Sequence, residues 1–169
     1  MSDAGVILRA MEPEDLDFLY EMENDRDTWR VGCTSVPYSR YVLHNYIASA
    51  SNDIYVDGQV RLIMEDAAGR MVGIADVFDF NAQNRRAEVG IVVKPEHRRR
   101  GYAEAALRLM ADYSLRTLRL HQLYAIVAAD NEASLRLFGK CGYVSCGVMR
   151  QWLFDGIEYR DAVMMQKIF

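Results

Sequence analysis

The chain has 169 residues, of which 51% are hydrophobic and 26% are charged. These proportions are typical of a globular domain, and we expect residues 1–169 to form a single domain with a substantial core. The formal net charge of −4 argues against a protein that binds nucleic acid through bulk charge. The sequence shows neither an N-terminal apolar run of the signal-peptide kind nor a stretch long enough to span a bilayer, so we expect a cytoplasmic location and no membrane partner.

Neither the cysteines nor the histidines predict a metal site. Cys33, Cys141 and Cys146 contain no Cys-x-x-Cys spacing, and the three histidines are widely separated. We interpret them as buried thiols and surface imidazoles.

The N-terminal half alternates between strand and helix patterns. Residues 6–9 predict a short strand, and residues 13–24, with Pro13 in a first-turn position, predict a helix. A second helix is expected to end near Ser51. Residues 61–64 and 71–80 then predict two strands joined by a turn at residues 66–69.

Two aspartates interrupt the second of these strands. Asp76 and Asp79 are interpreted either as solvent-facing strand positions or as carboxylates that bind a cationic substrate, and the first reading is preferred.

A basic turn follows the next strand, which covers residues 87–93. Pro95 ends this strand, and three arginines then lead through Gly101 into a helix over residues 102–118. Because the first turn of a helix leaves backbone N–H groups unpaired, this arrangement predicts a site for a phosphate anion. Glycine at this position also lets the backbone approach a ligand closely. The alternative is that the arginines form only a solvated surface.

The C-terminal part predicts a strand, a helix and a hairpin. Residues 123–128 form an apolar run expected to be covered on both faces, and Asp130 or Asn131 then caps a short helix. Residues 148–154 and 157–166 flank an Asp-Gly turn. The order of elements predicts an α/β fold with helices on both faces of the sheet.

Three large apolar side chains, Trp29, Trp152 and Phe154, are assigned to the core rather than to an interface. The sequence does not decide between a monomer and a homo-oligomer.

Residues 98–103, Arg-Arg-Arg-Gly-Tyr-Ala, match the pyrophosphate-binding signature of the GNAT superfamily of acetyl-CoA-dependent N-acetyltransferases. Glu88 in Ala-Glu-Val-Gly and residues 131–134, Asn-Glu-Ala-Ser, agree with the flanking positions. Within the family the chain most resembles the bacterial polyamine and ribosomal-protein N-terminal acetyltransferases. The resemblance implies a mixed, mostly antiparallel, twisted sheet with a central pair of parallel strands that splay apart.

The resemblance also implies which residues bind acetyl-CoA. Backbone groups on the strand would pair with the pantetheine arm, the basic turn would hold the pyrophosphate, and the helix after the next strand would meet the far side of the cofactor. The implied residues are Ile91, Val92, Val93, Arg98, Arg99, Arg100, Gly101, Tyr102, Ala103, Glu104, Asn131, Ser134 and Phe138.

The reaction implied is acetyl transfer to an amine, which attacks only when it is neutral. Glu88 is the candidate base, and an ion pair with Arg85 or Arg86 is the alternative reading of this residue. Many relatives carry a tyrosine where this chain has Phe138. In those relatives the tyrosine protonates the thiolate of CoA as it leaves, and phenylalanine has no proton to give. Three alternatives follow: the thiolate leaves unprotonated, Tyr143 or a water molecule supplies the proton, or the protein is a non-catalytic or weakly catalytic acyl-CoA-binding or regulatory protein.

The acceptor stays open among a polyamine, another small amine and a peptide N-terminus. Residues 33–36, Cys-Thr-Ser-Val, lack the acidic pair expected of the polyamine branch.

Overall fold

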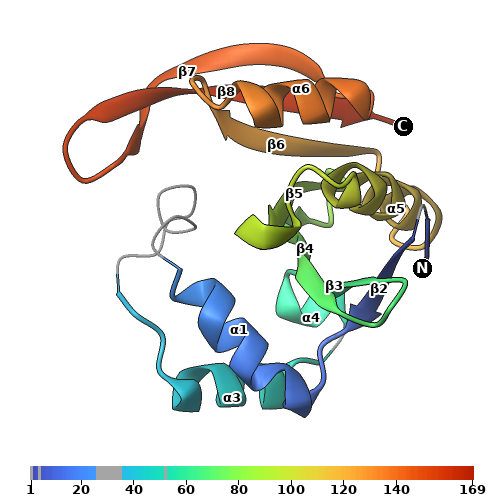
Figure 1. The fold of residues 1–169 in the computed structure, drawn as a ribbon. Helices are drawn as coiled ribbons and strands as arrows, with labels where there is room; N and C mark the ends of the chain where they lie inside the picture. Colours follow the sequence, from blue (N-terminus) through green and yellow to red (C-terminus); the bar gives the residue numbers. More distant parts are fainter. Residues whose placement is uncertain (1, 4, 26–35, 52) are drawn as a thin grey trace.

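The computed structural model describes residues 2, 3, 5–25, 36–51 and 53–169. The described residues form one sheet of eight strands in the order β1-β2-β3-β4-β5-β6-β8-β7, with helices on both of its faces (Figure 1). The strands are β1 (Ser2–Asp3), β2 (Val6–Ala10), β3 (Val60–Asp66), β4 (Met71–Asn81), β5 (Arg86–Val93), β6 (Gln122–Ala128), β7 (Val144–Phe154) and β8 (Tyr159–Ile168). The helices are η1 (Pro13–Asp15), α1 (Leu16–Glu23), α3 (Arg40–Ser49), α4 (Ile54–Asp57), η2 (Pro95–His97), α5 (Tyr102–Arg116) and α6 (Glu132–Lys140).

The sheet is antiparallel except where β5 meets β6. These two parallel strands pair at three positions that end with Glu88 opposite Tyr124. Beyond that pair, β5 continues to Val93 beside β4, and β6 continues to Ala128 beside β8. The structure therefore confirms the mixed, mostly antiparallel sheet with a central splayed pair. We call the opening between the two strands the fork.

Side-chain alternation along the strands builds a core on each side of the sheet. Ala75 and Val77 of β4 pack in the cluster that contains Leu107 and Met110 of α5. Ile74, on the other face of β4, packs in the cluster that contains Leu19 of α1. Alternate residues of the strand therefore point to opposite faces of the sheet, and each face packs against the apolar side of a helix.

The predicted elements are present, with differences at their ends. The sequence reading missed β1 and α4, because two and four residues are too few to show a period. The expectation that residues 123–128 are covered on both faces was wrong. Leu123, Ala125 and Val127 are buried, whereas the residues that alternate with them are only half-buried.

The assignment of Trp152 and Phe154 to the core was also wrong, and Trp29 lies outside the described residues. Trp152 is 58% exposed and Phe154 is 59% exposed. Both belong to β7, the last strand at one edge of the sheet. Apolar side chains on an edge strand gain no cover from a second neighbouring strand.

Candidate functional site

The basic turn brings an uncapped helix end to the mouth of the fork. Gly101 is the N-cap residue of α5, adopts a φ of 84° and provides no capping side chain. The first backbone bond of the helix runs from the Ala105 N–H to the Gly101 carbonyl, at 3.0 Å. The N–H groups of residues 102–104 thus precede the helical hydrogen-bond pattern, which is the arrangement that binds an anion.

The surroundings of this turn leave space for a ligand. A Cβ atom built on Gly101 meets nothing within 4 Å. Arg98, Arg99 and Arg100 are exposed, and the Arg98 Nε donates to the Val93 carbonyl at 3.1 Å. This bond ties the turn to the end of β5 and keeps positive charge there.

The second strand of the fork leads to the remaining predicted cofactor residues. Asn131 caps α6, and its side-chain oxygen accepts from the Ser134 N–H at 3.1 Å. The Asn131 N–H donates in turn to the carbonyl of Ala128, the last residue of β6. Residues 91–93, the basic turn and the start of α6 therefore lie along the two strands of one opening.

Glu88 lies on β5 at the point where the fork begins. Burial raises the pKa of its carboxyl group to about 7, a hydrogen bond from the Ile126 backbone N–H opposes the shift, and the charge of Asp79 adds to it. Among the ion pairs of the described residues, none joins Glu88 to Arg85 or Arg86. The Arg85 Nε donates instead to the Arg119 carbonyl. This geometry fits a carboxylate that exchanges a proton near neutral pH.

The two aspartates of β4 have different surroundings. Asp76 accepts from Arg61 at 2.8 and 3.0 Å, and Arg61 also contacts Glu23 at 2.5 Å, so Asp76 is held in an ion pair with an arginine that it shares with Glu23. Asp79 is exposed and accepts from the Tyr124 hydroxyl, on the strand beyond Glu88.

Sequence reasoning missed Tyr124, because nothing in the residues near it points to Asp79, 45 positions earlier. A tyrosine within an apolar run was the available signal.

Phe138 is buried, and its ring lies edge-on to that of Tyr143, with centroids 5.0 Å apart. Among the described residues, the Tyr143 hydroxyl is buried without a hydrogen-bond partner. Burial raises the pKa of this phenol. The candidate acid therefore lies directly beside the position where relatives carry a tyrosine.

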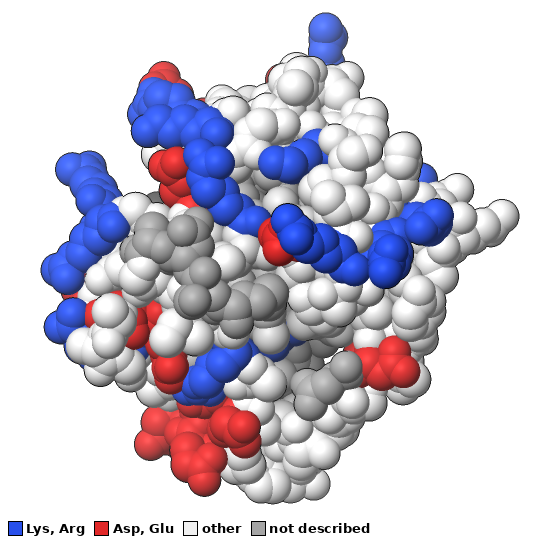
Figure 2. Space-filling view, turned by 90° about the vertical axis from the view of Figure 1, so that its right-hand side faces the viewer, with Lys and Arg blue, Asp and Glu red and all other residues white. Residues whose placement is uncertain are grey.

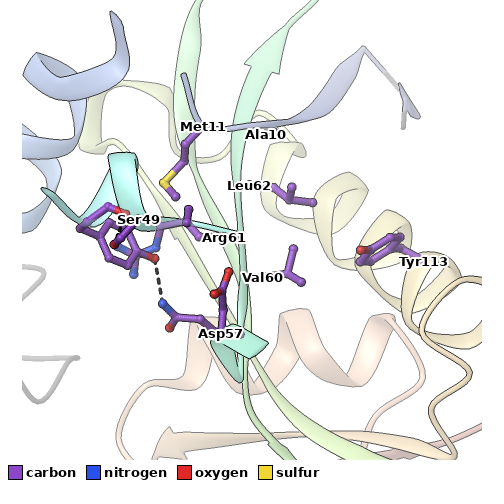
Figure 3. A pocket seen from close by; sticks show the side chains of 11 residues that line it. Ala10, Met11, Ser49, Asp57, Val60, Arg61, Leu62 and Tyr113 are labelled. Carbon is purple, nitrogen blue, oxygen red and sulfur yellow. Dashed lines mark hydrogen bonds between the residues drawn. The ribbon is translucent and has the colours of Figure 1, made fainter. Parts of the chain in front are cut away.

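A separate cavity of about 510 Å³ lies where β2 ends beside β3. Figure 3 shows Asp57 and Arg61 on one side of it and Tyr113 of α5 on the other. The Gln59 amide donates to the Tyr46 hydroxyl at 3.0 Å within its wall. None of the predicted cofactor or catalytic residues lines this cavity, so it is not the candidate site.

Basic and acidic side chains are unevenly distributed over one face of the molecule (Figure 2). Figure 2 shows one face, where Lys and Arg side chains gather over the upper part and Asp and Glu side chains gather near the lower edge. Within the described ranges, no group of three or more His, Cys, Asp or Glu side chains is placed to hold a metal ion. No helix in that part of the chain is long and apolar enough to cross a membrane.

Comparison with known proteins agrees with this arrangement. Residues 6–144 match the family described as "Acetyltransferase (GNAT) domain". The spermidine N(1)-acetyltransferase of Vibrio cholerae serotype O1 is 30% identical over 167 residues, which cover 96% of this chain and 92% of the relative.

Solved structures are similar over nearly the whole chain. The spermidine N-acetyltransferase from Vibrio cholerae in complex with CoA and spermine has a TM-score of 0.88 at 29% identity, covering 98% of this chain and 96% of that one. A dodecameric structure of the enzyme from the same organism has a TM-score of 0.83 at 29% identity, covering 98% and 95%. The chain therefore belongs to the GNAT family of N-acetyltransferases, enzymes that transfer an acetyl group from acetyl-CoA to an amine.

Proposed function

We propose that the acceptor is an aliphatic polyamine. The observation that carries the proposal is the pair of carboxylates at the fork, Glu88 and Asp79, neither of which forms an ion pair with a cation among the described residues. A polyamine is positively charged at neutral pH, and carboxylates are the side chains that bind such a group. The similarity to spermidine acetyltransferases over nearly the whole chain supports the same class.

In this proposal the fork holds acetyl-CoA, and residues 1–169 act as a single domain. The N–H groups at the start of α5 and the exposed arginines bind the pyrophosphate, and the backbone of residues 91–93 pairs with the pantetheine arm. Asn131, Ser134 and Phe138 line the other side. When bound, acetyl-CoA supplies the thioester that is cleaved. Because the cytoplasm contains acetyl-CoA, we place the reaction there.

Glu88 takes the proton of the attacking amine in this proposal. The acceptor reaches the fork as an ammonium ion and must lose one proton before its nitrogen has a free electron pair. A carboxylate with a pKa near 7 accepts that proton at neutral pH and releases it to solvent afterwards. A backbone N–H of residues 91–93 stabilises the negative charge that develops on the carbonyl oxygen.

The departure of the thiolate is tested at position 138. Phe138→Tyr is expected to retain activity within about tenfold, because a thiol of moderate pKa leaves without an acid or with help from Tyr143. Steady-state kinetics with acetyl-CoA and spermidine measure the effect. If Tyr143 is the acid, Tyr143→Phe lowers kcat while the KM for both substrates stays unchanged, and adding Phe138→Tyr to that variant restores it. Complete loss in Phe138→Tyr alone would show that Phe138 shapes the pocket.

The acceptor proposal is tested by a thiol-release assay with acetyl-CoA and a panel of amines. We expect spermidine and spermine to be acetylated with kcat/KM at least about tenfold above that for short peptides, because two carboxylates favour a polycation. A panel in which only peptides react would overturn the polyamine proposal. Binding of CoA by calorimetry without acetylation of any amine would indicate a binding protein instead.

We also propose that the protein self-associates through β7. This edge strand exposes Val148, Trp152 and Phe154, and a similar enzyme is dodecameric. Exposed apolar side chains in such number are typical of an interface between subunits.

A further inference from the structure

Three neighbouring strands each place one oxygen-bearing side chain at the start of the fork. Phe78 of β4 pairs with Glu88 of β5, and Glu88 pairs with Tyr124 of β6. Directly paired residues point to the same face of a sheet, so Glu88 and Tyr124 share a face. Asp79, the residue after Phe78, is hydrogen-bonded to the Tyr124 hydroxyl and therefore reaches the same face.

An irregularity in β4 explains how Asp79 reaches that face. The register passes from Phe78 opposite Glu88 to Asn81 opposite Arg86, so Asp79 and Phe80 together oppose Ala87 alone. In a regular strand Asp79 would point away from Glu88, toward the face where Ala87 is fully buried. The bulge, with a φ of 50° at Asp79, redirects the side chain. Aspartate is one of the few residues that tolerate this left-handed conformation.

The hydrogen bond from Tyr124 fixes the direction of the Asp79 carboxylate. Asp79 is exposed, and none of the ion pairs among the described residues includes it, in contrast to Asp76, which forms an ion pair with Arg61. One carboxylate can accept several hydrogen bonds, so Asp79 keeps acceptor capacity after binding the tyrosine. A primary ammonium group offers three N–H donors, and Asp79 and Glu88 together present carboxylate oxygens to it.

We propose that Asp79 binds the ammonium group of the acceptor beside Glu88, and that Tyr124 is a positioning residue that acts by holding Asp79 in place. This inference rests on the proposed function and assigns the recognition of the cationic amine to specific side chains. The bulge thus contributes to substrate recognition, because it directs the Asp79 side chain, which would otherwise face the core, toward the start of the fork.

The experiment compares Asp79→Asn, Tyr124→Phe and the double variant, using acetyl-CoA and spermidine. Asp79→Asn is expected to raise the KM for spermidine about tenfold, because the amide keeps an acceptor oxygen but lacks the negative charge that attracts the ammonium group, and Tyr124→Phe about threefold. Because Tyr124 acts through Asp79, the double variant should match Asp79→Asn within about twofold. The KM for acetyl-CoA should not change. Asp112→Asn on the exposed surface of α5 and Tyr159→Phe on β8 are the matched controls.

The pH profile provides a readout that a merely structural role would not move. Besides burial, which raises it, the pKa of Glu88 is lowered by the hydrogen bond from the Ile126 N–H on β6 and raised by the charge of the Asp79 carboxylate on β4. Glu88 also interacts electrostatically with the Tyr124 phenol, whose own pKa is raised by burial, a shift that the charge of Arg86 opposes. Since the charge of Asp79 raises the pKa of Glu88, Asp79→Asn should move the acid limb of kcat to lower pH.

The outcomes separate this inference from the function on which it rests. A wild-type enzyme that acetylates spermidine while both single variants keep its KM for spermidine would overturn the inference alone. An increase in both KM values with a lowered melting temperature would show a structural role and would also overturn it. A wild-type enzyme that acetylates no aliphatic amine would overturn the proposed function and the inference together.

Discussion

Glu88→Gln is expected to lower kcat about a hundredfold to a thousandfold, the usual contribution of a general base. Glutamine has nearly the same shape and keeps a side-chain oxygen for the Ile126 N–H, but it cannot take a proton from the amine. The KM for acetyl-CoA should stay within about twofold, because the pyrophosphate site lies at the other end of β5. Steady-state kinetics with acetyl-CoA and spermidine measure both values.

The wild-type pH profile follows from the direction of the pKa shift. Because burial raises the pKa of Glu88 to about 7, the side chain is protonated and inactive as a base below that pH. We expect kcat to rise about tenfold per pH unit below pH 7 and to level off above it. Glu88→Gln should lose this limb.

The same shift predicts an effect on stability with the opposite dependence on pH. A carboxyl group whose pKa is raised by folding contributes stability that is complete below its ordinary pKa of 4.5 and is lost as the pH rises through about 7. Glu88→Gln removes this loss. The melting temperature of the variant minus that of the wild-type protein should therefore be larger at pH 8 than at pH 4.5. Thermal unfolding of both proteins at the two pH values measures this difference.

Glu14→Gln on the exposed part of η1 is the matched control, and we expect it to leave the kinetics unchanged. A Glu88→Gln enzyme with full activity, or a wild-type kcat that is constant from pH 5.5 to pH 8, would contradict the assignment of Glu88 as the base.

The sequence predicted the site better where the signal is local. Glycine and arginines between a strand and a helix indicate an anion site from neighbouring residues alone, and the structure places an uncapped helix end there. Glu88 was chosen as the candidate base because the resemblance to the family implies a base on this strand. Its separation from Arg85 and Arg86 depends on the fold, because Arg85 turns toward the Arg119 carbonyl, 34 positions later.

The contacts that sequence reasoning missed depend on irregular backbone or on distant partners. Alternation along β4 places Asp79 on the wrong face, and only the bulge brings it to Tyr124. Apolar character likewise did not distinguish the core from an exposed edge, as Trp152 and Phe154 show. Strand and helix periods predict which segments form, whereas bulges and the cover over an edge strand depend on tertiary structure.

Gly101→Glu is expected to weaken CoA binding about a hundredfold, because a helix N-terminus that attracts an anion would carry a carboxylate instead. The Cβ atom at this position points into open space, so the added side chain has room without disturbing the core. A glutamate there enters the region where the pyrophosphate binds and repels it. Calorimetric titration with CoA measures the change without requiring catalysis.

Two variants separate the effect of charge from the effect of the backbone. Any L-residue at Gly101 is strained by its φ of 84°, and Gly69, in the turn between β3 and β4, has a φ of 74° and equally open space around a Cβ atom. Gly69→Glu should therefore show a similar decrease in melting temperature with unchanged CoA affinity. Gly101→Ala, which carries the strain without the charge, should lose less affinity than Gly101→Glu, and high salt should reduce the difference between these two. Unchanged CoA affinity in Gly101→Glu would mean that the pyrophosphate does not bind at this turn, because a carboxylate placed there would repel a pyrophosphate bound at the start of α5.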